Sequence, residues 1–123
     1  MRAKPSPKPD PAATLGKATL RASAQLGLSQ KDLAAILGIS EATASRLARG
    51  RSVDPKSKEG ELALLLLRIY RSLSSLVGGK ADAARAWMHA ANDHLKGTPA
   101  ALARTTTGLV AVADYLDGMR GKL

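Results

Sequence analysis

The ionisable side chains of this sequence do not form a pattern that predicts catalysis or a metal site. His89 and His94 are five residues apart, so on a helix they point about 140° away from each other and do not face one ligand. Asp114 and Asp117 share a helix face, but acids at this spacing usually only solvate a helix. The chain has no cysteine, which excludes disulfides, thiolate metal sites and cysteine nucleophiles. We therefore expect no enzymatic activity, no metal and no cofactor.

A stretch of small, polar and basic residues points instead to nucleic acid. The segment LSQKDLAAILGISEATASRLARG, residues 28–50, reads as two short helices joined by a turn. Ser29 and Asp32 have the spacing of a capping box, and Gly38 stands where a left-handed residue ends a helix cheaply. Ser40 can cap the second helix. Apolar residues that lock such a pair together are Leu33, Leu37, Ile39, Ala44 and Leu47. These features meet the physical requirements of a helix-turn-helix, whose second helix enters the major groove of DNA.

Eight residues around this segment are candidate DNA contacts. Arg46 can take a guanine edge with two hydrogen bonds, and Glu41 can accept one from cytosine. Gln30 is placed to donate to a phosphate. The alternative is that the arginines are solvated charges on a helix kept only for its packing. The full set is Gln30, Ser40, Glu41, Ala42, Thr43, Arg46, Arg49 and Arg51.

The net charge of +9 is unevenly spread along the chain. Residues 1–60 hold eleven Lys and Arg against five acids, giving +6, and residues 61–123 hold eight against five, giving +3. The larger excess lies on the half with the two-helix segment, which favours a polyanionic partner. A generally basic protein without such a partner is the alternative.

Strong helix formers dominate the elements that must position these side chains. The chain has no Phe, one Trp and two Tyr, and strand-favouring runs are missing, so we expect an all-α fold with an aliphatic core. Residues 1–14, with four prolines, predict a flexible basic tail. Residues 15–56 form the helix-turn-helix region, with a first helix at about 15–26. Residues 57–123 form a second helical domain, with helices at about 57–77, 81–95 and 107–120 and a short one begun by Thr98 and Pro99.

The helix expected at 57–77 is the most periodic element. Its broad apolar face is either part of a dimer interface or wholly internal core; that face holds Leu62, Leu65, Leu66, Ile69, Leu73, Leu76 and Val77. The longest apolar run, 62–67, is far shorter than the ~20 residues of a membrane helix. No apolar stretch follows the basic amino terminus, so a secretory signal is not expected. Cytoplasmic residence follows by default.

Two parts of the sequence resemble known families. The tracts SQKDLAAILGIS and SRLARG are similar to the Xre/Cro helix-turn-helix regulators. Further on, Trp87, Asn92, Leu95, Gly97 and Pro99 form the tract W-x4-N-x2-L-x-G-x-P, closed by G-x6-Y-L at 108–116. This pattern resembles the toxin-binding domain of the Xre/MbcA/ParS antitoxins. From the residues alone, Trp87 is interpreted as a core anchor, Asn92 as a residue that caps or bonds a turn, and Gly97 and Pro99 as shaping the connection.

The resemblance implies a partner, a RES-domain toxin that consumes or transfers the ADP-ribose part of NAD. In that family the carboxyl-terminal end of the antitoxin obstructs the active site of the toxin. Here the end reads YLDGMRGKL, an exposed tail with two cations and two glycines that allow the backbone to bend. An ordinary frayed terminus is the alternative. The implied toxin-binding residues are Tyr115, Gly118, Met119, Arg120, Gly121, Lys122 and Leu123.

The leading interpretation is therefore an antitoxin that binds its toxin and represses its own operon by binding operator DNA. A homodimer is expected, with a higher hetero-oligomer when the toxin is bound. One alternative is a stand-alone repressor of phage or plasmid type whose second half only dimerises. Another is a protein-binding inhibitor whose helix-turn-helix no longer meets DNA.

Overall fold

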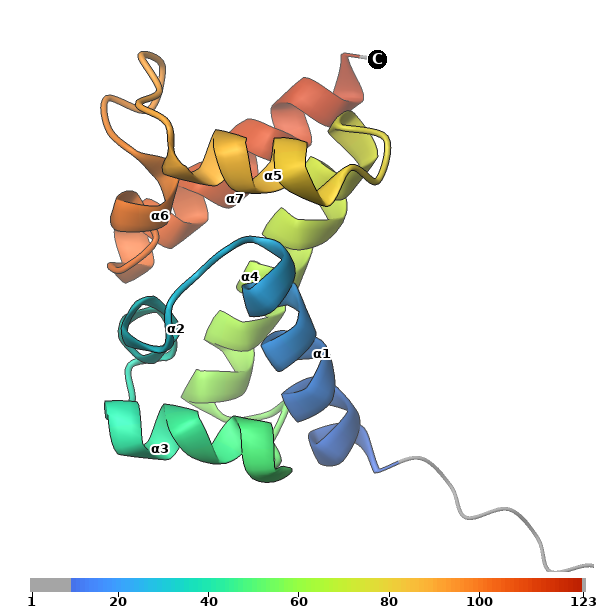
Figure 1. Ribbon diagram of the computed structural model, residues 1–123, viewed down its shortest axis with the longest axis vertical. Coiled ribbons are helices and arrows are strands. Elements are labelled where there is room, and N and C mark those ends of the chain that lie inside the picture. The colour runs from blue at the N-terminus through green and yellow to red at the C-terminus, as the bar shows by residue number, and fades with distance from the viewer. Residues whose placement is uncertain (1–9, 123) are drawn as a thin grey trace, which may run out of the picture.

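The computed structural model describes residues 10–122, and within that range the fold is all-α, as predicted. α4 runs through the middle of the molecule and packs against α1, α2, α5 and α7 (Figure 1). In chain order the elements are α1 (Pro11–Gln25), α2 (Gln30–Leu37), α3 (Glu41–Ser45), the 3₁₀ helix η1 (Arg46–Arg49), α4 (Lys58–Leu76), α5 (Ala81–His89), α6 (Pro99–Leu102) and α7 (Thr106–Gly121).

The first helix begins four residues earlier than the sequence predicts. Asp10 caps α1, its carboxylate accepting a hydrogen bond from the Ala12 N–H at 3.0 Å. Pro11 takes the first helical position, where its missing N–H costs nothing. Residues 11–14 are therefore helical and do not belong to a tail. The rest of the predicted tail, residues 1–9, lies outside the described residues.

The helix-turn-helix forms as its local signals indicate. The Ser29 hydroxyl accepts from the Asp32 N–H and the Asp32 carboxylate accepts from the Ser29 N–H, both at 3.0 Å, so the capping box is complete. Gly38 ends α2 in the left-handed conformation, with φ 69°. The second helix, expected as one unit over 40–49, is α-helical only through Ser45. It continues as the tighter η1 and ends at Gly50, with φ 92°.

α4 supplies the largest share of the core. Its apolar face is turned inward, with Leu62, Leu66, Ile69 and Leu73 all buried, which favours the internal-core alternative over a dimer interface for that face. Gly60 allows the first turn of α4 to approach the preceding loop closely, because a Cβ there would overlap the Asp54 carbonyl oxygen.

The second half departs more from prediction. α5 ends at His89, six residues before the expected end, because the chain turns back on itself. The Asn92 and Gly97 backbones pair with each other, and the Asn92 side chain accepts from the Leu95 N–H at 3.0 Å, so the prediction that Asn92 bonds a turn is confirmed. Lys96 adopts a left-handed φ of 58° in this loop. α7 is capped by Thr105 and starts one residue earlier than expected.

One continuous core joins both halves of the chain. Its fully enclosed side chains come from α2, α4, α5, α7 and the end of α1, and they include Leu26, Leu37, Leu66, Met88 and Leu116, each no more than 2% exposed. Within residues 10–122, no single helix has the length and apolar character needed to cross a membrane. α4 and α5 meet that test only as a pair, and the pair is bent by 118°.

Candidate functional site

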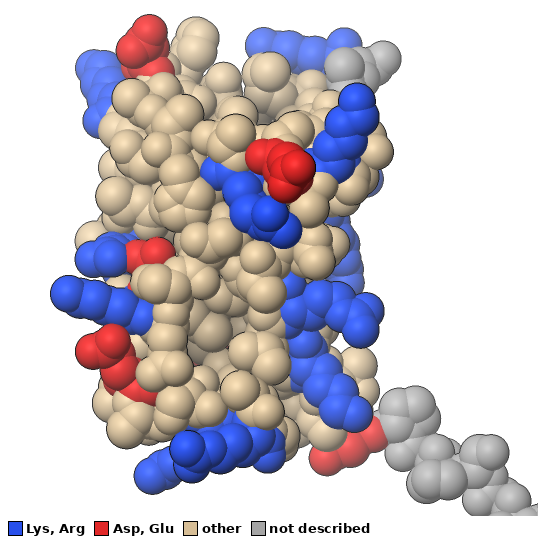
Figure 2. Space-filling model, viewed as in Figure 1, with Lys and Arg blue, Asp and Glu red and all other residues tan. Residues whose placement is uncertain are grey.

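The segment α3–η1 lies at one edge of the molecule with its amino-terminal residues open to solvent (Figure 1). Ser40, Glu41, Ala42, Arg46 and Arg49 are exposed, and Thr43 is half-buried. Ala44 and Leu47 on the opposite side are buried and attach the segment to the rest of the fold. Lys and Arg side chains gather along this edge (Figure 2). The predicted recognition residues therefore share one accessible surface.

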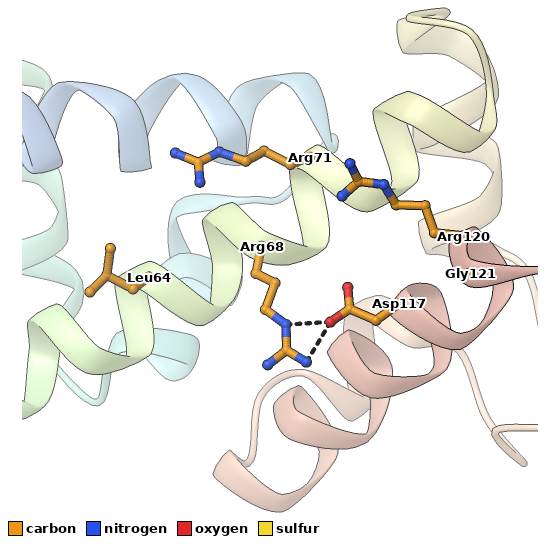
Figure 3. A pocket seen from close by; sticks show the side chains of 6 residues that line it. All are labelled: Leu64, Arg68, Arg71, Asp117, Arg120 and Gly121. Carbon is orange, nitrogen blue, oxygen red and sulfur yellow. Dashed lines mark hydrogen bonds and ion pairs between the residues drawn. The ribbon is translucent and has the colours of Figure 1, made fainter.

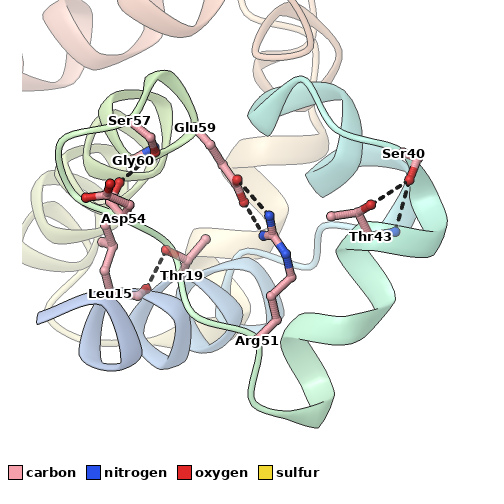
Figure 4. Close-up of polar contacts among 9 residues, drawn as sticks. All are labelled: Leu15, Thr19, Ser40, Thr43, Arg51, Asp54, Ser57, Glu59 and Gly60. Carbon is pink, nitrogen blue, oxygen red and sulfur yellow. Dashed lines mark hydrogen bonds and ion pairs between the residues drawn. The ribbon is translucent and has the colours of Figure 1, made fainter. Parts of the chain in front are cut away.

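Three predicted contact residues also hold the start of α3 in place. The Ser40 hydroxyl accepts from the Thr43 N–H at 3.0 Å and donates to the Thr43 hydroxyl at 2.8 Å (Figure 4). The Gln30 side-chain amide donates to the Glu41 carbonyl at 3.0 Å and so links the first turn of α2 to α3. A primary amide has two N–H groups, so Gln30 keeps one N–H that this contact does not use.

Arg51 differs from the other two arginines of this region. Its guanidinium makes two hydrogen bonds to the Glu59 carboxylate, and both side chains are partly buried (Figure 4). The hydrogen bond to Glu59 raises the pKa of Arg51, so the guanidinium keeps its charge under all ordinary conditions. The pair ties the end of η1 to the first turn of α4. Among the described residues, Arg46 and Arg49 have no ion-pair partner and present their full charge to solvent.

The carboxyl-terminal residues through Arg120 are helical, as the helix predicted at about 107–120 requires, although the sequence of the same stretch is also interpreted as an exposed tail able to bend. α7 continues through Gly121, and both Gly118 and Gly121 have ordinary helical backbone, so neither bends the chain. A Cβ added at either glycine would meet nothing within 4 Å, so both lie in open space. Met119, Arg120, Gly121 and Lys122 are exposed on the last turns. Leu123 lies outside the described residues.

An aromatic stack joins α7 to α5 and to the turn before α6. The Trp87 and Tyr115 ring centroids lie 6.2 Å apart and the rings are nearly parallel, and the His94 ring lies against Tyr115 at 5.9 Å. Trp87 is half-buried and packs against the core without entering it, so the prediction of a core anchor is met only in part. The neighbouring Met88 is fully enclosed and takes the anchoring place.

Ion pairs hold α7 against α4. The Arg68 guanidinium donates to Asp117 at 2.6 Å and to Asp114 at 3.1 Å, and the Ser72 hydroxyl donates to Asp117 at 2.7 Å. Hydrogen bonds from Ser72 and then Arg68 lower the pKa of Asp117. Asp114 and Asp117 therefore bond to a neighbouring helix in addition to solvating their own.

A long-range ion pair joins the capping box of α2 to the residues just before α7. Arg104, just before α7, donates to Asp32 Oδ1 at 2.9 Å from Nε, while Asp32 Oδ2 serves the capping box of Ser29. Burial alone raises the pKa of Asp32, but hydrogen bonds from Arg104 and Ser29 and the charge of Arg104 outweigh it, and the pKa is lowered. Sequence reasoning missed this pair, because no spacing rule connects residues 72 positions apart.

The described residues contain no group of three or more His, Asp or Glu side chains placed to hold a metal ion. His89 instead makes a structural contact, with its Nε2 atom 2.9 Å from the Gly27 carbonyl oxygen, 62 residues away in sequence. Because a carbonyl only accepts, the ring nitrogen at that contact carries the proton.

Comparison with protein families assigns both halves. Residues 7–68 match the model of the antitoxin Xre-like helix-turn-helix domain. Residues 72–122 match the model of the antitoxin Xre/MbcA/ParS C-terminal toxin-binding domain. A search of curated proteins found no match. With a helix-turn-helix domain followed by a toxin-binding domain, the chain belongs to the Xre-like helix-turn-helix antitoxins of toxin–antitoxin systems.

Proposed function

We propose that this antitoxin neutralises a RES-domain toxin with its carboxyl-terminal end and represses its own operon by binding operator DNA through α3 and η1. The observation that carries the proposal is the location of two accessible surfaces at opposite ends of α4 (Figure 1). One is the α3–η1 edge with Arg46 and Arg49, and the other is the exposed end of α7. The role is one of binding, and no step of it requires catalysis by this chain.

DNA contact at the first surface follows from its geometry and charge. The amino terminus of α3 presents Ser40, Glu41 and Ala42 toward the major groove, with Arg46 one turn further on to read a base. Arg49 and one N–H of Gln30 suit phosphates. Arg51 contributes through Glu59, by fixing where the chain leaves η1.

Operator binding is tested by fluorescence anisotropy on the region upstream of the operon at several salt concentrations. We expect Arg49→Ala to reduce the log–log salt slope by about 0.9, the value for one lost phosphate contact. Arg46→Ala is expected to weaken operator binding more than binding to unrelated duplex. Arg85→Ala on α5 removes the same charge elsewhere and serves as the control. Equal behaviour of all three variants would contradict DNA binding by this surface.

Toxin contact at the second surface rests on the end of α7. Tyr115 is fixed by its aromatic stack, and Met119, Arg120 and Lys122 project from the last turns. Positive side chains suit an active site made for a phosphate-bearing nucleotide such as NAD. Because α7 remains helical to Gly121, we propose that a preformed helix end is inserted, which saves the ordering entropy of a flexible tail.

Deletion of residues 118–123 tests this surface. We expect the truncated chain to keep its helical circular dichroism and its DNA binding but to lose protection of cells that express the neighbouring toxin gene. Undiminished protection would overturn blocking by the carboxyl-terminal end. If the chain shifts operator DNA and never co-purifies with the neighbouring gene product, it acts as a stand-alone repressor.

We also propose that the chain works as a homodimer in the cytoplasm, where the operator lies. A dimer places two recognition helices about one DNA turn apart, and a bound toxin holding two dimers together strengthens DNA binding by avidity. Light scattering coupled to size exclusion gives the mass of the free chain and of the complex, and a monomeric mass in both would contradict this arrangement.

A further inference from the structure

A long groove follows the solvent-facing side of α4 between α1 and α7. Three adjoining hollows of about 630, 320 and 350 Å³ make it up, and Arg71 lines all three. We define the α4 groove by its floor and two walls, one wall from α1 and one from α7. The floor holds Leu64, Leu67, Arg68, Tyr70 and Arg71, and the walls hold Lys17, Ala18 and Arg21 on one side and Asp117 and Arg120 on the other.

The groove carries a strong excess of positive charge. Arg68 is neutralised by Asp117 and Asp114, as the bonds drawn to Asp117 in Figure 3 illustrate. Like charges gathered around one channel repel each other, and an acidic occupant relieves that repulsion. The cations lining the groove that form no ion pair with any described residue are Lys17, Arg21, Arg71 and Arg120.

The floor of the groove also carries apolar side chains beside its two arginines. Leu64 is 48% exposed, the largest exposure among the bulky apolar side chains of the described residues. Leu67 and the half-buried ring of Tyr70 continue this floor along α4. Apolar side chains on this floor, together with the cations of the groove, are complementary to a segment that has apolar side chains on one face and carboxylates on the other.

Two other occupants fit less well. Duplex DNA presents phosphates on a convex surface and has no apolar group to cover Leu64 at the bottom of a channel. A second copy joined about a two-fold axis meets the same patch on its partner, which sets four cations against four identical cations. Duplex DNA would leave Leu64 uncovered, and a second copy would leave the positive charges of the groove uncompensated.

We propose that the α4 groove binds an acidic amphipathic segment of a partner protein, with an apolar side chain seated on Leu64 and carboxylates paired to Arg71, Lys17 and Arg21. The inference goes beyond the proposed function, since Leu64, Arg71, Lys17 and Arg21 are among neither the DNA contacts nor the toxin contacts proposed above; only Arg120 of the α7 wall belongs both to the groove and to the proposed toxin contacts. Its failure would leave that function standing.

The probe is a fluorescein-labelled helical peptide of Glu and Leu, with glutamates on one face and leucines on the other. Two comparison peptides replace Leu by Ser or Glu by Lys. Anisotropy titrations use the full chain and the double variant Lys17→Glu/Arg71→Glu. The matched control is Lys31→Glu/Arg85→Glu, which makes the same charge change on α2 and α5. Leu64→Ser tests the floor, and Arg71→Gln, which removes charge without reversing it, guards against misfolding of the double variant.

We expect the groove variant to weaken binding of the Glu–Leu peptide at least about 10-fold and the control variant less than about 3-fold, as for a contacting against a distant charge change. Leu64→Ser is expected to weaken the leucine peptide and leave the serine peptide unchanged. Equal loss in both double variants, or no binding by the unaltered chain, overturns the proposal. The proposal is also overturned if the groove variant loses as much affinity for operator DNA as it loses for the peptide. Dissociation of a dimer by Leu64→Ser without peptide binding would overturn it too, in favour of a second copy in the groove.

Discussion

The two halves of the molecule begin their helices in different ways. In the amino-terminal part of the chain, residues 10–77, α1, α2, α3 and α4 each start with a side chain that accepts a backbone N–H, supplied by Asp10, Ser29, Ser40 and Ser57. In the other half only α7 has such a cap, from Thr105, while α5 and α6 have none. Caps orient a helix start locally, so the α3–η1 edge is positioned by its own sequence. The second half relies on contacts with distant parts of the chain.

That dependence is visible in the packing around α6 and α7. Gly108 lets the first turn of α7 lie against the end of α6, since a Cβ there would overlap the Leu102 carbonyl oxygen. Arg104 reaches Asp32 across the two halves, and His89 reaches the Gly27 backbone. We therefore expect the second half to be the more sensitive to changes in tertiary contacts, and the first half to changes in caps.

The largest effect is expected at Gly108. Gly108→Ala forces a backbone contact to open and should lower the free energy of unfolding by about 3 kcal/mol, the upper range for overpacking. Gly118→Ala is the control, because it adds the same methyl group to the same helix in open space, and it should stabilise by roughly 0.5–1 kcal/mol. Urea unfolding followed by circular dichroism measures both. Equal effects would mean that α7 does not pack on α6 as described.

Asp32 bonds both to Ser29 in the capping box of α2 and to Arg104 before α7, and its replacement should have the second-largest effect on the free energy of unfolding. Asp32→Ala removes one half of the capping box and the partner of Arg104, so we expect a loss of about 2 kcal/mol from the cap and the charge-assisted bond together. Arg104→Ala leaves the capping box intact and should lower the free energy of unfolding by only about 0.5–1 kcal/mol, since solvent reaches the Arg104 side chain, which is 42% exposed. If both variants lower the free energy of unfolding equally, the capping box of α2 contributes nothing to stability. That result would contradict the idea that caps stabilise the amino-terminal part of the chain.

A third prediction compares the caps themselves. Ser40→Ala removes the hydrogen bond to the Thr43 N–H and should cost about 1 kcal/mol. Thr98→Ala, at the start of α6, removes no such bond and should change stability by only roughly a few tenths of that amount. The same unfolding assay applies, with operator binding as a second readout for Ser40→Ala. A larger effect at Thr98 would reverse the comparison.

The smallest effect concerns pH. The folded pKa of Asp32 lies below its ordinary value of 3.8, so its stabilisation is complete above that value and is lost as the pH falls through the folded pKa. Asp117, whose pKa is also lowered, acts in the same direction on the surface. We expect the stability gap between the unaltered chain and Arg104→Gln to narrow by roughly a few tenths of a kcal/mol between about pH 6 and about pH 3. A stability difference between these two proteins that grows as the pH falls would contradict the predicted direction of the effect.

Local signals explain what could be predicted from sequence. The capping box, Gly38 and the Ser40 cap act within four residues, and the structure has all three. The exposed residues of the α3–η1 edge lie on one surface because those local signals orient α3. The expected start of α1 was wrong because four prolines suggested disorder, whereas Pro11 is compatible with a first helical turn capped by Asp10.

Long-range pairings explain which features could not be predicted from the sequence. Arg51 meets Glu59 and Arg104 meets Asp32 only after the helices have packed, and no spacing rule anticipates either pair. The early end of α5 depends on the Asn92–Gly97 pairing, which interrupts a pattern that is helical by composition. The α4 groove is likewise a property of three helices together, with residues from α1, α4 and α7.

The length of α4 sets the distance between the two proposed binding surfaces, one for DNA and one for the toxin. Its 19 residues span about 28 Å at about 1.5 Å per residue, more than twice the roughly 12 Å width of a major groove. A toxin bound at the end of α7, as proposed above, would therefore lie away from a duplex bound by α3 at the opposite end of α4 (Figure 1). Because α4 is one continuous helix, it keeps these two surfaces apart. Steric release of the antitoxin from its operator would therefore require a toxin bound to a neighbouring protomer.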